Sequence, residues 1–246
     1  MTVIATSLGD WLATPQGRYL LAREQALFDQ AVADIFGFNA VQLGLPQHDL
    51  LRGSRIPLRV QAADEAGAQL RLLPQELPLE ADSLDLLLLP HILEFNDDPH
   101  QILREVERVL RPEGELILSG FNPRSLWGVR RALGCRDGYP WCGQFIALTR
   151  LKDWLALLGF EVTGVRFACY APPFASAQWL ERFHFMEPPG DRWWAVSGGV
   201  YFLQAKKRVP GMRLIKPRWN EGLVGKLLPV APKLNRDVTQ KIQKDD

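Results

Sequence analysis

The chain has 246 residues, a formal net charge of +1, 47% hydrophobic residues and 23% charged residues. This length fits one α/β domain with additions, and the composition is that of an ordinary soluble globular protein. The near-neutral net charge of the whole molecule does not indicate nucleic-acid binding. We find no apolar run long enough to span a bilayer and no secretory leader. We therefore expect a cytoplasmic protein without a membrane partner.

The three cysteines are Cys135, Cys142 and Cys169. They show neither a C-x-x-C spacing nor an even-numbered framework, so we expect no metal site and no structural disulfide.

The first part of the chain, residues 1–36, is predicted to form a helical cap. Apolar residues recur at helical spacing from Ser7 to Phe36, with a break at residues 14–17. Such helices either cover an edge of a sheet or close over a ligand site, and both interpretations stay open.

Three strands are predicted next, at Asn39–Leu45, Ile56–Gln61 and Ala68–Leu73. Only residues 47–55 separate the first two strands, so the helix that normally joins parallel strands is expected to be missing or very short.

Residues 77–123 contain the clearest pattern of the chain. The run Leu86–Leu89 is apolar throughout, as in a parallel strand buried on both faces. Asp97-Asp98-Pro99 opens an amphipathic helix, and Glu115–Ser119 then reads as another strand. A strand, a helix and a strand in this space predict a right-handed parallel crossover, the unit of doubly wound α/β sheets.

The last third of the chain predicts a helix capped by Thr149 and ended by Gly159, then strands at Phe160–Tyr170 and Gly198–Lys206. Residues 206–246 contain eleven Lys and Arg against four Asp and Glu, whereas the rest of the chain is mildly acidic. We expect this basic tail to be mostly disordered, with RNA as a possible partner through phosphate contacts.

The segment from Leu77 to Gly114 resembles class I S-adenosylmethionine (SAM) dependent methyltransferases of the type 11 branch. The resemblance is carried by Leu77-Pro78-Leu79, Ser83-Leu84-Asp85, Leu86–Leu89, His91-Ile92-Leu93-Glu94 and Arg108-Val109-Leu110-Arg111-Pro112-Glu113-Gly114. It is close over about a fifth of the chain and looser over residues 37–205. It implies an α/β fold with three layers and a doubly wound, mostly parallel sheet, a Rossmann-like methyltransferase fold, and SAM as cofactor.

The resemblance also places the cofactor site, although its usual polar residues are changed here. In the family the first strand ends in an acidic residue and a glycine-rich loop, but Gln42 holds the acidic position and Pro46 the second glycine. No acid ends the predicted second strand, and the nearest are Asp64 and Glu65. The implied cofactor-binding residues are Gly44, Gln42, Leu45, Gln75, Leu89, Pro90 and His91.

Three residues are candidates for the chemistry of the site or for its substrate wall. His91 follows the fourth strand and is a candidate general base, although a wall residue that packs on the cofactor is the favoured interpretation. Asn122 and Trp127 follow the fifth strand, where they suit a substrate wall or a simple turn.

The function favoured by these patterns is SAM-dependent methyl transfer to a small molecule. A methyltransferase fold that has lost catalysis and serves as a binding or regulatory partner is the alternative. A nicotinamide-binding protein is disfavoured because the G-x-G-x-x-G fingerprint is absent.

Overall fold

A computed structural model of the chain describes residue 5 and residues 7–65, 67–134, 138–174, 176–183 and 195–208. The tail predicted for residues 206–246 lies almost wholly outside this part of the chain. The described elements are α1 (Leu8–Leu12), α2 (Pro15–Val32), β1 (Asn39–Leu43), β2 (Leu58–Ala63), β3 (Leu70–Arg71), β4 (Leu84–Pro90), α3 (Pro99–Val109), β5 (Leu110–Phe121), α4 (Leu126–Ala132), α5 (Leu148–Leu157), β6 (Phe160–Ala168), α6 (Ala177–Arg182), a 3-10 turn (Ala195–Ser197) and β7 (Val200–Lys207).

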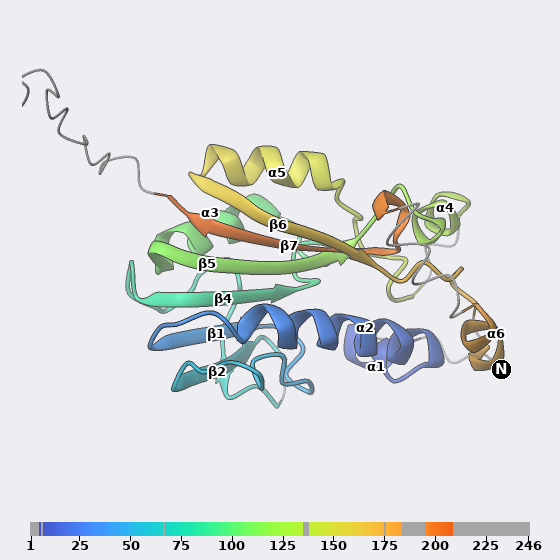
Figure 1. The fold of residues 1–246 in the computed structure, drawn as a ribbon, viewed down its shortest axis with the longest axis horizontal. Coiled ribbons are helices and arrows are strands. Elements are labelled where there is room, and N and C mark those ends of the chain that lie inside the picture. The colour runs from blue at the N-terminus through green and yellow to red at the C-terminus, as the bar shows by residue number, and fades with distance from the viewer. Residues whose placement is uncertain are drawn as a thin grey trace, which may run out of the picture. The chain divides into compact units, whose positions relative to one another are not determined.

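The seven strands form one sheet in the order β3-β2-β1-β4-β5-β7-β6 (Figure 1). All neighbours pair in parallel except β7, which runs antiparallel to both β5 and β6. The doubly wound, mostly parallel sheet predicted from the sequence is therefore confirmed.

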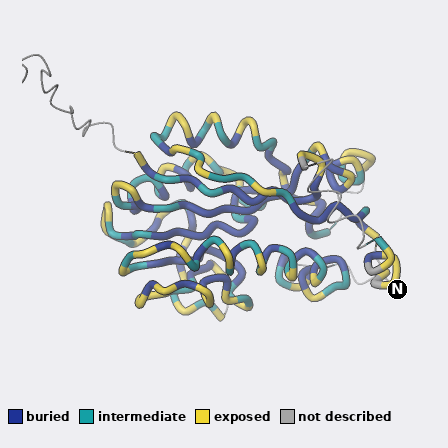
Figure 2. Tube along the Cα trace, viewed as in Figure 1, coloured by how far each residue is buried: buried dark blue, intermediate teal, exposed yellow. Residues whose placement is uncertain are grey.

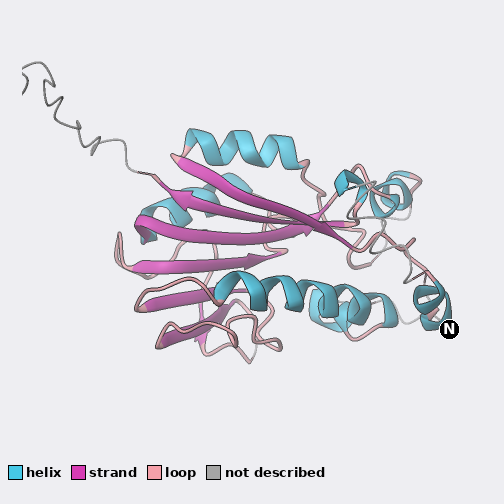
Figure 3. Cartoon of the chain, in the orientation of Figure 1, coloured by secondary structure: helices cyan, strands magenta, loops and turns pink. Residues whose placement is uncertain are grey.

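Helices cover both faces of this sheet, as Figure 3 shows. Phe28 and Val32 of α2 pack against Leu86 and Leu88 on one face. Ile102 of α3 packs on the other face, together with side chains of α5. Because successive side chains of a strand point to opposite faces, the apolar run in β4 supplies both cores. Figure 2 shows the strands as the buried layer between the helices.

No helix connects β1 to β2, as expected. The second strand runs from Leu58 to Ala63, so the predicted strand Ile56–Gln61 was placed two residues too early. Its pairing with β1 is continuous from Asn39–Leu58 to Leu43–Ala62. Asp64 therefore follows directly on the end of the strand.

The ends of several predicted helices and strands need correction. Thr149 does not cap α5: Ala147 holds the N-cap position, without a side-chain hydrogen bond, and Thr149 lies inside the helix. Gly159, with φ +80°, ends that helix in the left-handed conformation as predicted. The last strand continues to Lys207, whose ammonium group lies 3.0 Å from Asp82 and 3.1 Å from Glu107. The first basic residues of the predicted tail thus belong to the sheet.

Among the described residues, no helix is long and apolar enough to cross a membrane.

Candidate functional site

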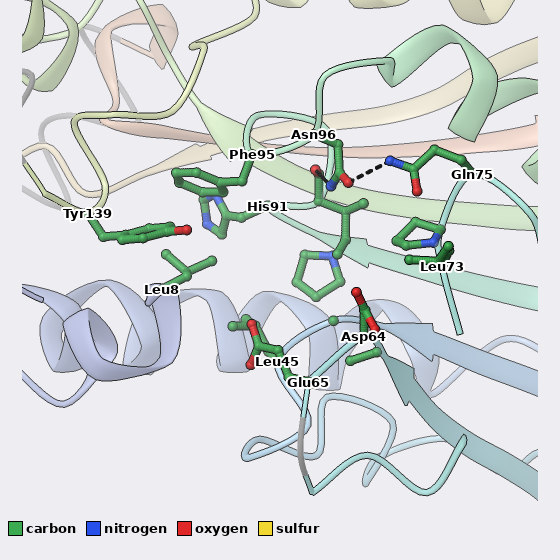
Figure 4. Close-up of a pocket in the computed structure, with 15 residues that line it drawn as sticks. Leu8, Leu45, Asp64, Glu65, Leu73, Gln75, His91, Phe95, Asn96 and Tyr139 are labelled. Carbon is green, nitrogen blue, oxygen red and sulfur yellow. Dashed lines mark hydrogen bonds between the residues drawn. The ribbon is translucent and has the colours of Figure 1, made fainter. Parts of the chain in front are cut away.

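A cavity of about 300 Å³ lies at the carboxyl ends of β1, β2 and β4 (Figure 4). This volume is at the lower end of the range for small-molecule sites. Doubly wound sheets bind ligands at this edge, where the strand order reverses between β1 and β4. The lining residues are Leu8, Gly44, Leu45, Ala63, Asp64, Glu65, Leu73, Pro74, Gln75, Pro90, His91, Ile92, Phe95, Asn96 and Tyr139.

The turn after β1 forms one wall of the cavity in an uncommon backbone conformation. Gly44 has φ +83° and Leu45 has φ +50°. A leucine in the left-handed region is strained, and such strain gathers at functional sites. At Gly44 an added Cβ would lie 2.5 Å from Cδ1 of Ile92 on the opposite wall. The turn therefore approaches the β4 side too closely for a side chain at this position.

Gln42 holds this turn in place from the core. It is fully buried, and its Nε2 donates to the carbonyl oxygens of Gly44 at 3.0 Å, Leu45 at 3.2 Å and His48 at 2.8 Å. Its Oε1 accepts from the backbone N–H of Leu50 at 2.9 Å. One amide side chain thus satisfies four backbone hydrogen-bonding groups of a loop that contains no helix. Gln42 supports the cavity wall without lining the cavity.

Two carboxylates follow the end of β2 and line the cavity. Asp64 pairs with the exposed Arg71 at 3.3 Å, and Glu65 accepts from Gln47 at 3.5 Å. In Figure 4 the carboxylate of Asp64 points toward the middle of the cavity. With no Lys or Arg among the described lining residues, the cavity favours ligands that carry positive charge.

A pair of amide side chains closes the opposite side. Nε2 of Gln75 donates to Oδ1 of Asn96 at 2.9 Å, and Nδ2 of Asn96 donates to the carbonyl oxygen of Ile92 at 2.6 Å. This chain of bonds fixes which amide atoms face the cavity.

His91 joins the cavity wall to a buried charged cluster. Its Nε2 lies 2.9 Å from Oε1 of Glu24 on α2, and its Nδ1 lies 2.9 Å from Oε2 of Glu94. All three side chains are buried. The other oxygen of Glu94 accepts a hydrogen bond from the backbone N–H of Phe121. The ring centroids of Phe121 and His91 lie 4.3 Å apart. The cluster ties the N-terminal helix α2 to β4 and β5.

The two carboxylates keep the imidazole protonated. Burial by itself lowers the pKa of His91, but the charges of Glu24 and Glu94 and their hydrogen bonds outweigh it and raise that pKa to about 10. Burial also raises the pKa of Glu94 above its usual value. His91 therefore holds a proton on each nitrogen at neutral pH and has no lone pair for general base catalysis.

We expect the imidazole signals of His91 in NMR spectra to stay constant between about pH 6 and pH 8, since its pKa is raised well above that of an ordinary histidine. A midpoint near 6.5 for His91 would contradict the protonated cluster.

Five of the seven predicted cofactor residues line the cavity: Gly44, Leu45, Gln75, Pro90 and His91. Leu89 is fully buried in the core, and Gln42 supports the turn from behind.

The two predicted substrate residues do not line it either. Nδ2 of Asn122 donates to the carbonyl oxygens of Val196 and Gly198, and Nε1 of Trp127 donates to that of Ala171. Both side chains are buried and hold together the loops that follow β5 and β6.

The residues that sequence reasoning missed come mainly from distant segments. Leu8 of α1 and Tyr139 of the loop before α5 reach the cavity from segments far apart in the sequence. Asp64 and Glu65 were visible as the nearest acids, but the predicted end of β2 left them outside the site. Nothing local in the sequence distinguishes Glu24 as the partner of His91.

Within the described residues, no group of three or more His, Cys, Asp and Glu is arranged to hold a metal ion. Cys142 is exposed and Cys169 is buried.

Comparison with known proteins supports the class that the fold and cavity indicate. Residues 57–118 match the model of the family described as Methyltransferase domain. The uncharacterized protein YafS of Escherichia coli K12 is 34% identical over 165 residues, which cover 65% of this chain and 68% of YafS.

Two further similarities are more limited. The malonyl-[acyl-carrier protein] O-methyltransferase of Laribacter hongkongensis is 34% identical over 35% of this chain and 29% of its own. A solved structure of a SAM-dependent methyltransferase of Thermotoga maritima, a possible histamine N-methyltransferase, superposes with a TM-score of 0.55 at 17% identity. That match covers 78% of this chain and 97% of the other.

The chain belongs to the same family as YafS, and it contains a class I SAM-dependent methyltransferase domain.

The cavity fits SAM by the chemistry of its lining. SAM combines a ribose with free hydroxyls, an adenine whose amino group donates and whose ring nitrogens accept hydrogen bonds, and a positively charged sulfonium. Carboxylates, amides and apolar walls are all present here, and the acids complement the sulfonium charge. The altered loop after β1 is therefore compatible with the cofactor, since Gln42 orders a turn that glycines and a helix order elsewhere.

Proposed function

We propose that this methyltransferase acts on a small, partly apolar molecule. The observation that carries the proposal is the cavity itself, in which Leu8, Phe95 and Tyr139 provide apolar surface near the acids Asp64 and Glu65. Leu8 comes from the N-terminal helix α1, so the helical cap forms part of the site and narrows the space left for an acceptor.

The lining residues suggest how the cofactor is held. Asp64 would accept hydrogen bonds from the ribose hydroxyls, and the Gln75–Asn96 pair would meet the base edge. The Gly44–Leu45 turn would contact the cofactor through its backbone.

Catalysis in this site would depend on positioning and exclusion of water. When bound, SAM supplies a methyl group on a positively charged sulfur, which is a strong electrophile. Both ring nitrogens of the protonated His91 are hydrogen-bonded to glutamates, so this residue fixes the cavity wall at the end of β4. It would not remove a proton from the acceptor. The acceptor would accordingly be a group that is already nucleophilic without a histidine base.

Two predictions from the sequence lie beyond the described structure. RNA binding through the basic tail concerns residues outside the described part of the chain, and cytoplasmic location stays a prediction. No observation favours a catalytically inactive binding protein over the enzyme.

Replacing Asp64 with asparagine should weaken SAM binding at least about tenfold, because a charge-assisted hydrogen bond contributes about 1.5–3 kcal/mol. Isothermal titration calorimetry measures the change. The matched control is Glu80→Gln, which neutralises an exposed acid outside the cavity lining. Equal losses in both variants would show that net charge, and not the position of Asp64, controls the affinity.

The acceptor class is tested with SAM that carries a labelled methyl group. The enzyme is incubated separately with the small-molecule, RNA and protein fractions of a bacterial extract. We expect label in the small-molecule fraction, and its loss with Asp64→Ala. Label confined to RNA or protein would contradict a small-molecule acceptor.

A further inference from the structure

The described surface exposes a group of large apolar side chains at one end of the sheet. Trp179 is 49% exposed, Leu133 81% and Val196 71%. We call this group the end patch, and its members are Leu126, Val129, Leu133, Phe174, Trp179 and Val196. They are six of the eleven exposed large apolar residues in the described part of the chain, although they come from three separate segments. Patches of this kind mark contact surfaces.

The topology explains why these segments lie together. They follow β5, follow β6 and precede β7, and β7 is antiparallel to both neighbours, so all three meet at the same edge. Hydrogen bonds link them: Trp127 Nε1 to the Ala171 carbonyl at 3.0 Å, and Asn122 Nδ2 to the Val196 carbonyl at 2.9 Å. In Figure 1, α4 and α6 both lie beyond the arrowheads of β4 and β5.

The fold fixes the orientation of α4. Its inner side carries Trp127, which is fully buried, and Gly128, where an added Cβ would lie 2.1 Å from the carbonyl oxygen of Pro123. Leu126, Val129 and Leu133 recur at helical spacing on the other side and are at least half exposed. The leucines and valine therefore face outward because the inner face is already packed.

The α4 segment of the end patch is positively charged. Residues 122–134 contain Arg124, Arg130 and Arg131 and no acid. The guanidinium of Arg130 lies 4.5 Å from the ring of Trp141, and that of Arg182 lies 5.7 Å from the ring of Trp179. Arg130 stacks on a buried ring and donates to the carbonyl oxygen of Pro173, whereas Arg182 stacks on a member of the end patch.

From this arrangement we propose that the end patch docks the enzyme on an anionic lipid surface. Aliphatic side chains enter the acyl boundary, a tryptophan lies at the interface, and arginines pair with anionic headgroups. Four of the six members are aliphatic and offer no ring on which a nucleic-acid base could stack, which disfavours RNA. Such docking needs no membrane-spanning helix. Docking on a lipid surface differs from the sequence-based expectation of no membrane partner. The proposal does not depend on the identity of the methyl acceptor.

The test is co-sedimentation of the full chain with phosphatidylcholine vesicles, with and without phosphatidylglycerol. The variant carries Leu126→Glu and Leu133→Glu, and the control is Leu157→Glu, an exposed leucine on α5 (86%). We expect binding to the anionic vesicles only. We further expect at least about a tenfold weaker partition for the double variant and none of this loss for the control. Circular dichroism verifies that all three proteins are folded.

Three results would overturn the proposal. One is no sedimentation with anionic vesicles. Another is equal binding of the wild type and the double variant, which would assign the contact to the basic C-terminal residues. The third is binding of an oligoribonucleotide or an acidic protein, weakened by the double substitution, in the absence of vesicle binding.

Discussion

Replacing His91 with alanine is expected to lower the free energy of unfolding at pH 7 by about 3–5 kcal/mol, because it leaves two buried carboxylates without their cation. Urea denaturation measures the loss. His100→Ala is the matched control: this exposed histidine contacts Trp154 at a centroid distance of 4.0 Å, and its removal should cost less than about 1 kcal/mol.

A double-mutant cycle separates the charge effect from the lost packing. His91→Gln should cost much less when combined with Glu24→Gln than alone, because the second change removes one of the stranded charges. Purely additive losses would mean that Glu24 and His91 do not form the buried pair.

The pH dependence of stability follows from the raised pKa of His91. A group with a higher pKa in the folded state stabilises the fold fully below its unfolded pKa of 6.5. That contribution is lost as pH rises toward the folded value of about 10. The wild type should therefore lose stability between these two pH values, and the His91→Gln variant should lose less.

Replacing Gly44 with aspartate is expected to abolish SAM binding. At φ +83° the new Cβ meets Ile92, and the added carboxylate projects into a turn that has no room for a side chain. Calorimetry should show at least about a hundredfold weaker affinity, a change of about 2.7 kcal/mol.

Gly67→Asp provides the matched control for this substitution. Gly67 also has a positive φ, of +98°, but an added Cβ there has no neighbour within 4 Å. Its affinity for SAM should stay within about twofold of the wild type. Wild-type affinity in Gly44→Asp would exclude the β1 turn from the binding site.

Local sequence patterns were sufficient for the frame of the fold and for part of the site. The apolar run of β4 and the capped helix α3 each bury a continuous surface, so their periodicity is strong. The end of β2 was harder to place, since Gln61 interrupts its apolar pattern and the pairing with β1 determines where it stops. As a result Asp64 was left outside the predicted site.

Long-range contacts account for the rest. Glu24 and His91 are 67 residues apart, and no local spacing connects a glutamate on an amphipathic helix with a strand end. Gln42 was expected to meet the cofactor because it stands where relatives have an acid. The structure instead uses its amide to order the loop from Gly44 to Leu50. The position of a side chain in a motif predicts which site it lies near. Its hydrogen-bond partners depend on the conformation of the adjacent loop.

Binding of SAM in this altered cavity is tested most directly by titrating the wild-type chain with SAM and its demethylated product. We predict one site with a dissociation constant below about 100 μM. At ten times that constant, the free energy of unfolding should rise by about 1.4 kcal/mol. If neither compound gave a heat of binding or any stabilisation up to millimolar concentration, SAM binding in this cavity would be contradicted.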